Sequence, residues 1–382
     1  MTRHKSRHRG SSQKRLDARG RKIIQSGAIQ RIGPGKYKAP SQSKPGVYYE
    51  VISTNNCWEC TCLYHKRRKS RCKHIRAAQC LEEKIQEDLH NVMYMDDPGV
   101  VCVECKGTNC RHRETRKKKH GVSHRYVCRD CGKKFTHNPG FVGRHYDPDT
   151  ITRRVEDVVM GKSPALAAQS ITENGRTPAP STVWTWVEYY GKLLKNLNGI
   201  LACRAGHEWC ADEIYFKCKG KGMWLYGVMA TKSRFIIYHE TSPDKLAYNA
   251  VHLFTKAIEL AAKIPDVLTT DALNGYAKGL DEAVPADVRP KLIHRRNAGV
   301  NKRHDNNNLY ERFNGILKDR FKCERGFNSP QPALHVLFIA YYNLLRPHSG
   351  LGMKTPAEAL GVILRGSNKW LTAIRHAALF CM

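Results

Sequence analysis

The chain has 382 residues, 41% of them hydrophobic, and its 65 Lys and Arg against 34 Asp and Glu give a net charge of +31. This length allows two or three domains with cores of their own. No apolar run of about 18 residues and no secretory leader is evident, so we expect an intracellular, cytoplasmic protein without a membrane partner. The charge favours a polyanionic partner such as nucleic acid over a merely solubilising surface.

Residues 1–46 are rich in Lys, Arg, Ser, Gly and Pro and lack apolar periodicity. A segment of this composition buries too little apolar surface to fold by itself. We therefore expect a mostly disordered basic tail, either a solvated tail with no further task or an arm that binds phosphates without sequence preference.

The first of two predicted zinc modules covers residues 47–98. A Cys-x-Cys pair is followed after nine residues by Cys-x-His, and three thiolates with one imidazole suit tetrahedral Zn²⁺. A short strand pair leading into a helix at Ile75 would hold the ligands. Cys57 and Cys80 fall outside the pattern, and a set of scattered reduced cysteines is the alternative. The expected ligands are Cys60, Cys62, Cys72 and His74.

This pattern resembles the SWIM zinc finger. The ligand order is the same, Trp58 precedes the first ligand, and the second pair stands in the run Cys-Lys-His-Ile. The resemblance implies a structural zinc ion in this module.

A second zinc module, a zinc ribbon, is predicted over residues 99–146. Two Cys-x-x-Cys knuckles are separated by 22 residues, and Gly132 supplies the turn after the second. The ligands would be Cys102, Cys105, Cys128 and Cys131, with Cys110, His112, His120 and His124 as irregularly spaced competitors. The segment between the knuckles is basic enough to follow a phosphate backbone, so we expect Lys117, Lys118 and Lys119 to bind nucleic acid.

Three helices are expected in residues 147–200. Asp147-Pro148 begins the first, Ser163-Pro164 a short second and Ser181 the third. The apolar faces are Ile151, Val155, Val158 and Val159 in the first helix and Val183, Val187, Tyr190 and Leu194 in the third. A short middle helix suggests a helix-turn-helix, in which Thr182 and Thr185 of the third helix would face DNA. A three-helix unit that only packs is the alternative.

Residues 201–365 predict a mixed α+β domain. Three strands, roughly 209–218, 223–230 and 234–240, form a meander, and Ser242-Pro243 begins a long helix. A buried strand ending at Asp271, a helix, a short strand at 291–296 and a further helix complete the order β-β-β-α-β-α-β-α. This order implies a mixed sheet of five strands flanked by helices. Residues 366–382 are expected to form a carboxyl-terminal helix.

Three acids occupy informative positions in this domain: Asp212 within the first strand, Asp271 at the carboxyl end of the buried strand, and Glu311 on a helix. Glu311 shares its helix face with Asn307, Asn314 and Lys318. If this face lies over the open end of the sheet, the three carboxylates converge. Glu213, Glu240, Asp281 and Asp319 lack such positions, and we set them aside.

Converging carboxylates repel one another unless cations join them, and Mg²⁺ or Mn²⁺ is the expected ion for oxygen ligands. Two ions held by Asp212, Asp271 and Glu311 would activate a water or a 3′-hydroxyl and stabilise the leaving oxygen of a phosphodiester. The asparagines would orient the ligands. Phosphates would be bound by Lys318, Arg320 and Lys322.

Residues 145–365 resemble the D-D-E transposases of prokaryotic insertion sequences, whose catalytic domain is ribonuclease H-like as in retroviral integrases. The resemblance rests on WCADEIYFKCKGKGMWLYGVMA, TTDALNGY, NNNLYERFNGILKDRFKCERGF and YYNLLRPHSGLGMKTPAEALG. It implies that Asp212, Asp271 and Glu311 are the catalytic metal-binding triad of a DNA transposase. The 39 residues between Asp271 and Glu311 exceed the usual spacing, so AGVNKRHD is expected to carry an insertion.

The resemblance also implies terminal inverted repeats and target DNA as substrates, and at least a homodimer to join two element ends. Two alternatives stay open. One is a domesticated DNA-binding regulator whose catalytic fold is a scaffold, and the other is a structure-specific nuclease without strand transfer.

Overall fold

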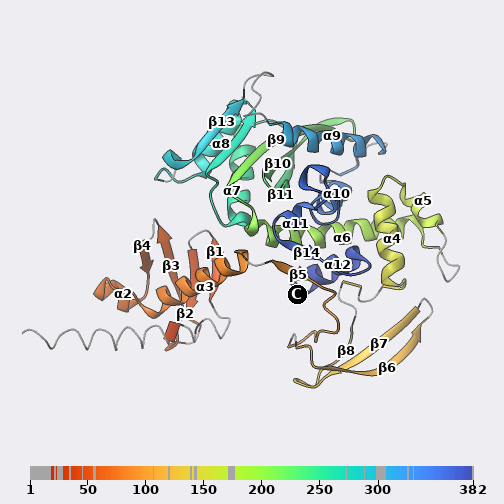
Figure 1. Ribbon diagram of the computed structural model, residues 1–382, viewed down its shortest axis with the longest axis horizontal. Coiled ribbons are helices and arrows are strands. Elements are labelled where there is room, and N and C mark those ends of the chain that lie inside the picture. The colour runs from red at the N-terminus through yellow and green to blue at the C-terminus, as the bar shows by residue number, and fades with distance from the viewer. Residues whose placement is uncertain are drawn as a thin grey trace, which may run out of the picture. The chain divides into compact units, whose positions relative to one another are not determined.

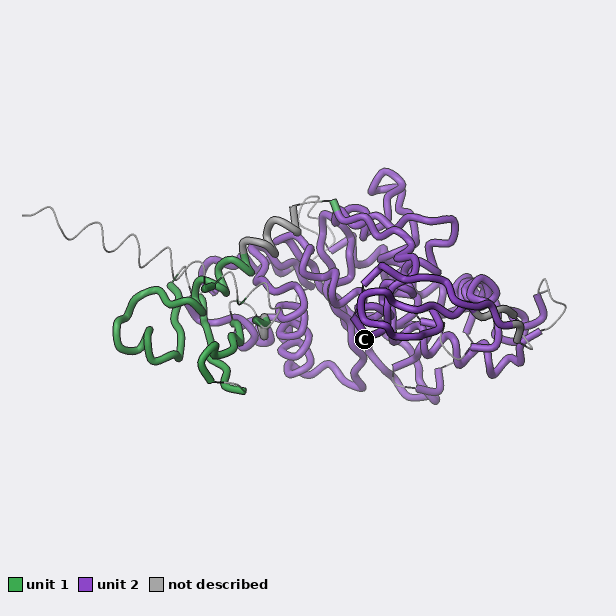
Figure 2. Tube along the Cα trace, turned by 90° about the horizontal axis from the view of Figure 1, so that it is seen from below, with its two compact units in different colours: residues 1–92 green, residues 93–382 purple. Residues whose placement is uncertain are grey.

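The protein divides into two compact units, Met1–Val92 and Met93–Met382, which are described separately (Figure 2). The computed structural model describes residues 19–20, 23, 29–33, 36–44, 46–54, 57–90, 92–105, 107–118, 121–137, 140–141, 144–170, 177–271, 273–287, 289–297, 307–324, 327–329 and 331–380. None of the helices in these ranges is long and apolar enough to span a membrane.

The first unit is a four-stranded antiparallel sheet packed against a helix (Figure 1). Its elements are β1 (Gln30–Gly33), β2 (Lys36–Pro40), β3 (Tyr48–Thr54), β4 (Cys57–Cys60), α2 (Leu63–Arg68) and α3 (Lys73–His90). Tyr37 and Ala39 of β2 are buried against Val51 of β3 and Ile75 of α3. The expected β3–β4 strand pair and the following helix are therefore present.

The expectation of a disordered tail through residue 46 is wrong for its second half. β1 and β2 lie within it, and alternate residues of β2 are buried. Lys36 and Lys38 are the exposed members of that alternation, which is why a high basic content did not prevent folding. Residues 1–18 lie outside the described residues.

Both predicted zinc-ligand sets are assembled. In each set the four ligand atoms lie within 4.8 Å of one another, and all four residues of the first set are buried. Sγ–Sγ distances in the second set are 3.6 Å for Cys102 and Cys131 and 3.5 Å for Cys105 and Cys128. Tetrahedral ligands at a Zn–S distance of about 2.3 Å lie about 3.8 Å apart. The donor chemistry and spacing of both sets therefore fit Zn²⁺.

The second set belongs to a three-stranded antiparallel sheet of β6 (Cys110–Lys118), β7 (Gly121–Cys128) and β8 (Lys134–Thr136). Cys102, Cys128 and Phe135 form a small core of their own. Because so little apolar surface is buried here, the metal would supply much of the stability of this sheet.

A zinc count tests the first set. Replacing Cys72 with Ala removes one of four ligands, and we expect the purified protein to hold one zinc ion per chain in place of two, with a lower thermal midpoint. Cys57→Ala is the matched control, because Cys57 is exposed and lies outside the set. Elemental analysis measures both proteins. Two zinc ions per chain in Cys72→Ala would contradict the assignment.

The second unit contains the three expected helices α4 (Pro148–Val159), α5 (Pro164–Gln169) and α6 (Pro180–Leu201). Asp147 and Ser163 cap α4 and α5 by accepting hydrogen bonds from Thr150 N and Leu166 N. The predicted apolar faces of α4 and α6 are buried. The third helix begins one residue earlier than expected: Pro180 follows Ala179 as its first residue, and Ser181 lies inside its first turn.

The five-stranded mixed sheet is the centre of the second unit (Figure 1). Its strands are β9 (Glu208–Cys218), β10 (Lys221–Ala230), β11 (Phe235–Ser242), β12 (Val267–Asp271) and β13 (Ile293–Asn297), in the order β11-β10-β9-β12-β13. β9, β10 and β11 pair antiparallel, whereas β12 pairs parallel to both β9 and β13. This meander followed by two crossovers gives the ribonuclease H-like fold that was expected.

Helices cover both faces of the sheet. α7 (Ala247–Ala261) and α8 (Asn274–Ala283) lie on one face, where Tyr276 contacts Glu213. α9 (Asn308–Lys322) and α10 (Ala333–Leu344) lie on the other, where His335 packs on Phe216. α7 begins five residues after Ser242, because β11 continues to that serine. The start expected at Ser242-Pro243 is therefore wrong.

Four further elements belong to the second unit. They are α11 (Pro356–Ala359), β14 (Val362–Leu364), α12 (Lys369–Phe380) and β5 (Met93–Met95). Thr355 and Glu358 form a capping box at the start of α11. β5 pairs parallel with β14, so residues 93–95 belong to this unit and not to the zinc module predicted to end at residue 98.

Arg320 of α9 joins the domain of the five-stranded sheet to α4. Its side chain is buried, its guanidinium donates hydrogen bonds to the carbonyls of Val158 (2.6 Å) and Val159 (2.9 Å), and it forms an ion pair with Glu324 at 2.8 Å. The last carbonyls of a helix have no partner within the helix, and a cation there also suits the helix dipole. The expectation that Arg320 binds phosphate is therefore wrong.

Stability measurements test this contact. Arg320→Leu removes the donor to the buried Val159 carbonyl, one of the donors to the Val158 carbonyl and the ion-pair partner of Glu324, and we expect a loss of about 2–3 kcal/mol in the free energy of unfolding in urea. Lys322→Leu is the control, since Lys322 is exposed on the same helix and pairs with the exposed Asp319. Equal stability of the two variants would contradict a structural role for Arg320.

Candidate active site

Asp212 and Asp271 lie on neighbouring strands at the point where those strands separate. β12 pairs with β9 only from Val267 to Thr269, opposite Glu208 to Cys210. Beyond these pairs the sheet opens, with Asp212 on β9 and Asp271 at the end of β12. One carboxylate oxygen from each of Asp212, Glu213 and Asp271 lies within 4.8 Å of the others.

The polar face of α9 covers this opening. Asn307 Nδ2 donates to the carbonyl of Ala211 (3.0 Å), and Asn314 Nδ2 donates to Asp212 Oδ2 (3.0 Å). Glu311 lies between these two contacts on the same face, and its charge contributes to the raised pKa of Asp212. Glu311 is exposed, and it is not among the acids whose oxygens lie within 4.8 Å of one another.

A glycine in β10 allows α9 to lie close to the sheet. Gly227 of β10 is directly opposite Asp212, and a Cβ built on it would lie 1.9 Å from the hydroxyl oxygen of Tyr310. Any side chain at this position would push α9 away from the strand. Burial raises the pKa of Tyr310, and the nearby Asp212 charge raises it further, so the phenol stays neutral.

Glu213, which was not expected to be a site residue, forms the acid cluster together with Asp212 and Asp271. It points to the α8 face, where its two oxygens meet different donors: Lys245 Nζ at Oε1 and the Tyr276 hydroxyl at Oε2. Burial raises the pKa of Tyr276 well above its usual range, so this hydroxyl remains a donor. Glu213 and Asp212 are adjacent on β9 and contact helices on opposite faces of the sheet, yet one carboxylate oxygen of each lies within 4.8 Å of the other.

Hydrogen bonding distinguishes Glu213 from the two aspartates. Asp212 uses one oxygen, Oδ2, for Asn314, and Asp271 uses Oδ1 for the backbone amide of Leu273. Metal-binding carboxylates in proteins are typically held in this way, by one hydrogen bond that orients the ligand. Both oxygens of Glu213 are occupied by donors. Asp212 and Asp271 are therefore better suited to bind a cation than Glu213.

The electrostatics of the cluster favour a bound cation. Burial, followed by the charge of Glu213, raises the pKa of Asp212 to about 7, and burial raises the pKa of Asp271. Asn307 Oδ1 and Asn314 Oδ1 are buried without a hydrogen-bond partner among the described residues. Close carboxylates and orphaned amide oxygens together fit Mg²⁺ or Mn²⁺ with its bound waters.

The other predicted nucleic-acid ligands are exposed or half-buried, or lie outside the described side chains. Lys318, Lys322 and Thr185 are exposed, and Thr182 is half-buried. Thr185 donates a hydrogen bond to the carbonyl of Ser181 within α6. Lys117 and Lys118 lie in β6, but their side chains and all of Lys119 lie outside the described part of the chain.

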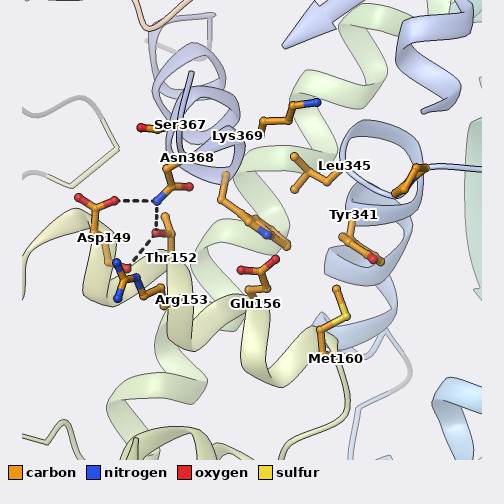
Figure 3. A pocket seen from close by; sticks show the side chains of 12 residues that line it. Asp149, Thr152, Arg153, Glu156, Met160, Tyr341, Leu345, Ser367, Asn368 and Lys369 are labelled. Atoms are coloured by element: carbon orange, nitrogen blue, oxygen red, sulfur yellow. Dashed lines mark hydrogen bonds between the residues drawn. The ribbon is translucent and has the colours of Figure 1, made fainter. Parts of the chain in front are cut away.

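A cavity of about 580 Å³ lies elsewhere, between α4, α10 and α12 (Figure 3). Asn368 donates hydrogen bonds to Asp149 and Thr152 at one side of it, and Tyr341 and Trp370 line another side. None of the clustered acids lines this cavity. It is therefore not the candidate active site.

Thermal unfolding tests the cation site. Without divalent cations, Asp212→Asn relieves the repulsion of buried carboxylates, and we expect a higher thermal midpoint than wild type, by about 2–4 °C for each kcal/mol relieved. Adding Mg²⁺ should raise the midpoint of the wild-type protein but not that of the variant.

The pH dependence has a defined sign. A raised carboxyl pKa means that ionised Asp212 costs stability as pH rises from its ordinary value near 4 through about 7. The advantage of the variant should thus be full at pH 8 and absent in mild acid. Asp319→Asn, at an exposed acid, is the control. A lower midpoint for Asp212→Asn at pH 8 without Mg²⁺ would contradict the prediction.

Residues 293–356, which include Glu311 but neither aspartate, match the family described as Integrase core domain. None of the curated proteins matches the chain. The simian T-cell lymphotropic virus intasome in complex with PP2A regulatory subunit B56 gamma is 21% identical at a TM-score of 0.31, over 41% of this chain and 54% of that one. The match thus spans about half the length of the matched chain in that structure.

The catalytic core domain of HTLV-2 integrase in complex with magnesium is 20% identical in its dimeric form and 18% in its trimeric form, with TM-scores of 0.29. These matches cover 40% of this chain and 94% and 95% of the viral domains. The ribonuclease H-like fold is assigned from the order and pairing of the five strands in the sheet. The family match confirms the resemblance to proteins with an integrase-type core.

Proposed function

We propose that this chain, whose residues 293–356 match an integrase core domain, is a DNA transposase that cleaves and joins the ends of a mobile element. The observation that carries the proposal is the position of two aspartates on the ribonuclease H-like sheet and of Glu311 on the helix that covers them. Asp212 and Asp271 meet where β9 and β12 separate, and α9 brings Glu311 over the same opening.

Asp212, Asp271 and Glu311 would hold two Mg²⁺ or Mn²⁺ ions. Such ions supply an activated water or 3′-hydroxyl and stabilise the leaving oxygen in phosphodiester chemistry. Side chains and a backbone amide of this chain would hold the metal-binding acids in position. Asn314 fixes Asp212, the Leu273 amide fixes Asp271, and the contact of Tyr310 with Gly227 sets the distance of α9 from the sheet.

DNA as the substrate is supported by the charge of the chain and by its exposed cations. The net charge is +31, and Lys318 and Lys322 are exposed on α9, beyond Glu311 on the helix that covers the acid cluster. The α4–α6 unit would bind the inverted repeats through Thr182 and Thr185, and the two zinc modules would add contacts to the same DNA. Joining two element ends requires at least a dimer.

Strand-transfer assays test the proposal. Asp271→Asn removes a metal ligand while keeping the hydrogen bond from Leu273, so we expect Mg²⁺-dependent cleavage and transfer to fall by at least about 10³-fold with DNA binding retained. Asp281→Asn is the matched control, because Asp281 is an exposed acid on α8 that pairs with Arg289. The substrate is linear DNA carrying the repeats that flank the gene. Undiminished transfer by Asp271→Asn would disprove the proposed mechanism.

A further inference from the structure

Lys245 carries a positive charge at the edge of the acid cluster. Its ammonium group contacts Glu213 and lies 3.8 Å from the ring centroid of Trp224. The side chain of Glu213 is 4% exposed, whereas that of Lys245 is 35% exposed. One partner of this ion pair is therefore fixed in the protein interior, and the other is accessible to a ligand.

The backbone just before Lys245 is held by several hydrogen bonds. The carbonyl of the preceding residue, Asp244, accepts hydrogen bonds from the Tyr226 hydroxyl and from Asn249 Nδ2, each at 3.1 Å. Asp244 Oδ1 accepts from Asn249 Nδ2 at 2.7 Å, and Ser242 Oγ accepts from the Asp244 amide at 3.3 Å. Lys245 thus starts from a rigid turn, which lowers the entropy lost when its ammonium group binds a ligand.

The charge of Lys245 also reaches the metal-binding side of the cluster. Glu213, which contacts the ammonium group of Lys245, has a carboxylate oxygen within 4.8 Å of an oxygen of Asp271. A phosphodiester held at Asp212 and Asp271 would therefore lie within the field of the Lys245 ammonium group. Ammonium groups on flexible stems are common point-charge ligands of phosphate in proteins.

We propose that Lys245 is a phosphate-binding residue of the active site and that Glu213 is its positioning residue, not a metal ligand. The proposal rests on the proposed function and adds a substrate contact to it. Glu213 holds Lys245 with one oxygen while Tyr276 holds the other, and the Trp224 ring supports the ammonium group from the side. The charges of Glu213 and Lys245 cancel. The pair therefore places an ammonium group beside the site without changing the net negative charge that the metal ions must balance.

The double variant Glu213→Gln/Lys245→Met tests the proposal without leaving a buried charge unpaired, because Gln still accepts from Tyr276. Two quantities are measured on the full-length protein: Mg²⁺ affinity by titration calorimetry, and the salt dependence of binding to duplex DNA with Mg²⁺ present. We expect Mg²⁺ affinity to stay within about threefold of wild type. The slope of log K against log salt should fall by about 0.9, the value for one lost phosphate contact.

Cleavage by the double variant should fall about 100-fold, and Glu213→Gln alone should not add to the loss caused by Lys245→Met. Lys245→Arg should keep the salt slope, because it keeps the charge. Lys256→Met is the matched control: Lys256 lies on α7, pairs with Glu259 and should behave as wild type.

Two outcomes overturn the proposal. A loss of Mg²⁺ affinity of about tenfold or more in the double variant would make Glu213 a metal-site residue, and an unchanged salt slope would mean that Lys245 binds no phosphate. A wild-type protein without Mg²⁺-dependent cleavage would instead contradict the proposed function. In that case Mg²⁺ affinity and the salt slope still decide the role of Lys245.

Discussion

Repulsion between carboxylates at the opening between β9 and β12 is the constraint on which the site depends. Three acids bring oxygens within 4.8 Å of one another in a partly buried position. Like charges this close destabilise the fold unless protons, donors or cations balance them. A donor stabilises the negative charge of each acid. Asn314 donates to Asp212, the Leu273 amide donates to Asp271, and Lys245 and Tyr276 donate to Glu213. The pattern leaves the two aspartates ready for a metal ion.

Helix α9 links the acid cluster to the rest of the second unit. Its apolar side chains Tyr310, Phe313 and Leu317 are buried in the core, and its polar face lies on β9. At its carboxyl end Arg320 holds the last turn of α4. The helix that carries Glu311 is thereby fixed at one end by the sheet and at the other by the predicted DNA-binding helices.

Much of this arrangement was predictable because it depends on local patterns. The spacing of Cys and His gave both ligand sets, alternation gave the meander, and the i, i+4, i+7 positions of Asn307, Glu311 and Asn314 gave the polar face of α9. These features follow from a period of 2 or 3.6 residues and need no tertiary information. The basic β2 strand, with Tyr37 and Ala39 alternating between lysines, was missed because charge outweighed alternation in the prediction.

The roles of Glu213 and Arg320 could not be read from the sequence. Glu213 was set aside because it stands neither at a strand end nor on the polar helix face, and only the folded structure shows that its carboxylate lies within 4.8 Å of those of Asp212 and Asp271. Arg320 stood among exposed cations of the same helix, and nothing local marked it as the partner of carbonyls more than 160 residues away in the chain. Lys245 is similar, since its contacts with Glu213 and Trp224 join three separate elements.

The central claim is that Asp212, Asp271 and Glu311 form one metal site beside a Glu213–Lys245 pair. Anomalous diffraction from crystals grown with Mn²⁺ tests it most directly. The account predicts manganese peaks bounded by oxygens of Asp212, Asp271 and Glu311, with Glu213 still bound to Lys245 and Tyr276. No peak at this opening, or a peak ligated by Glu213 with Lys245 displaced, would contradict it.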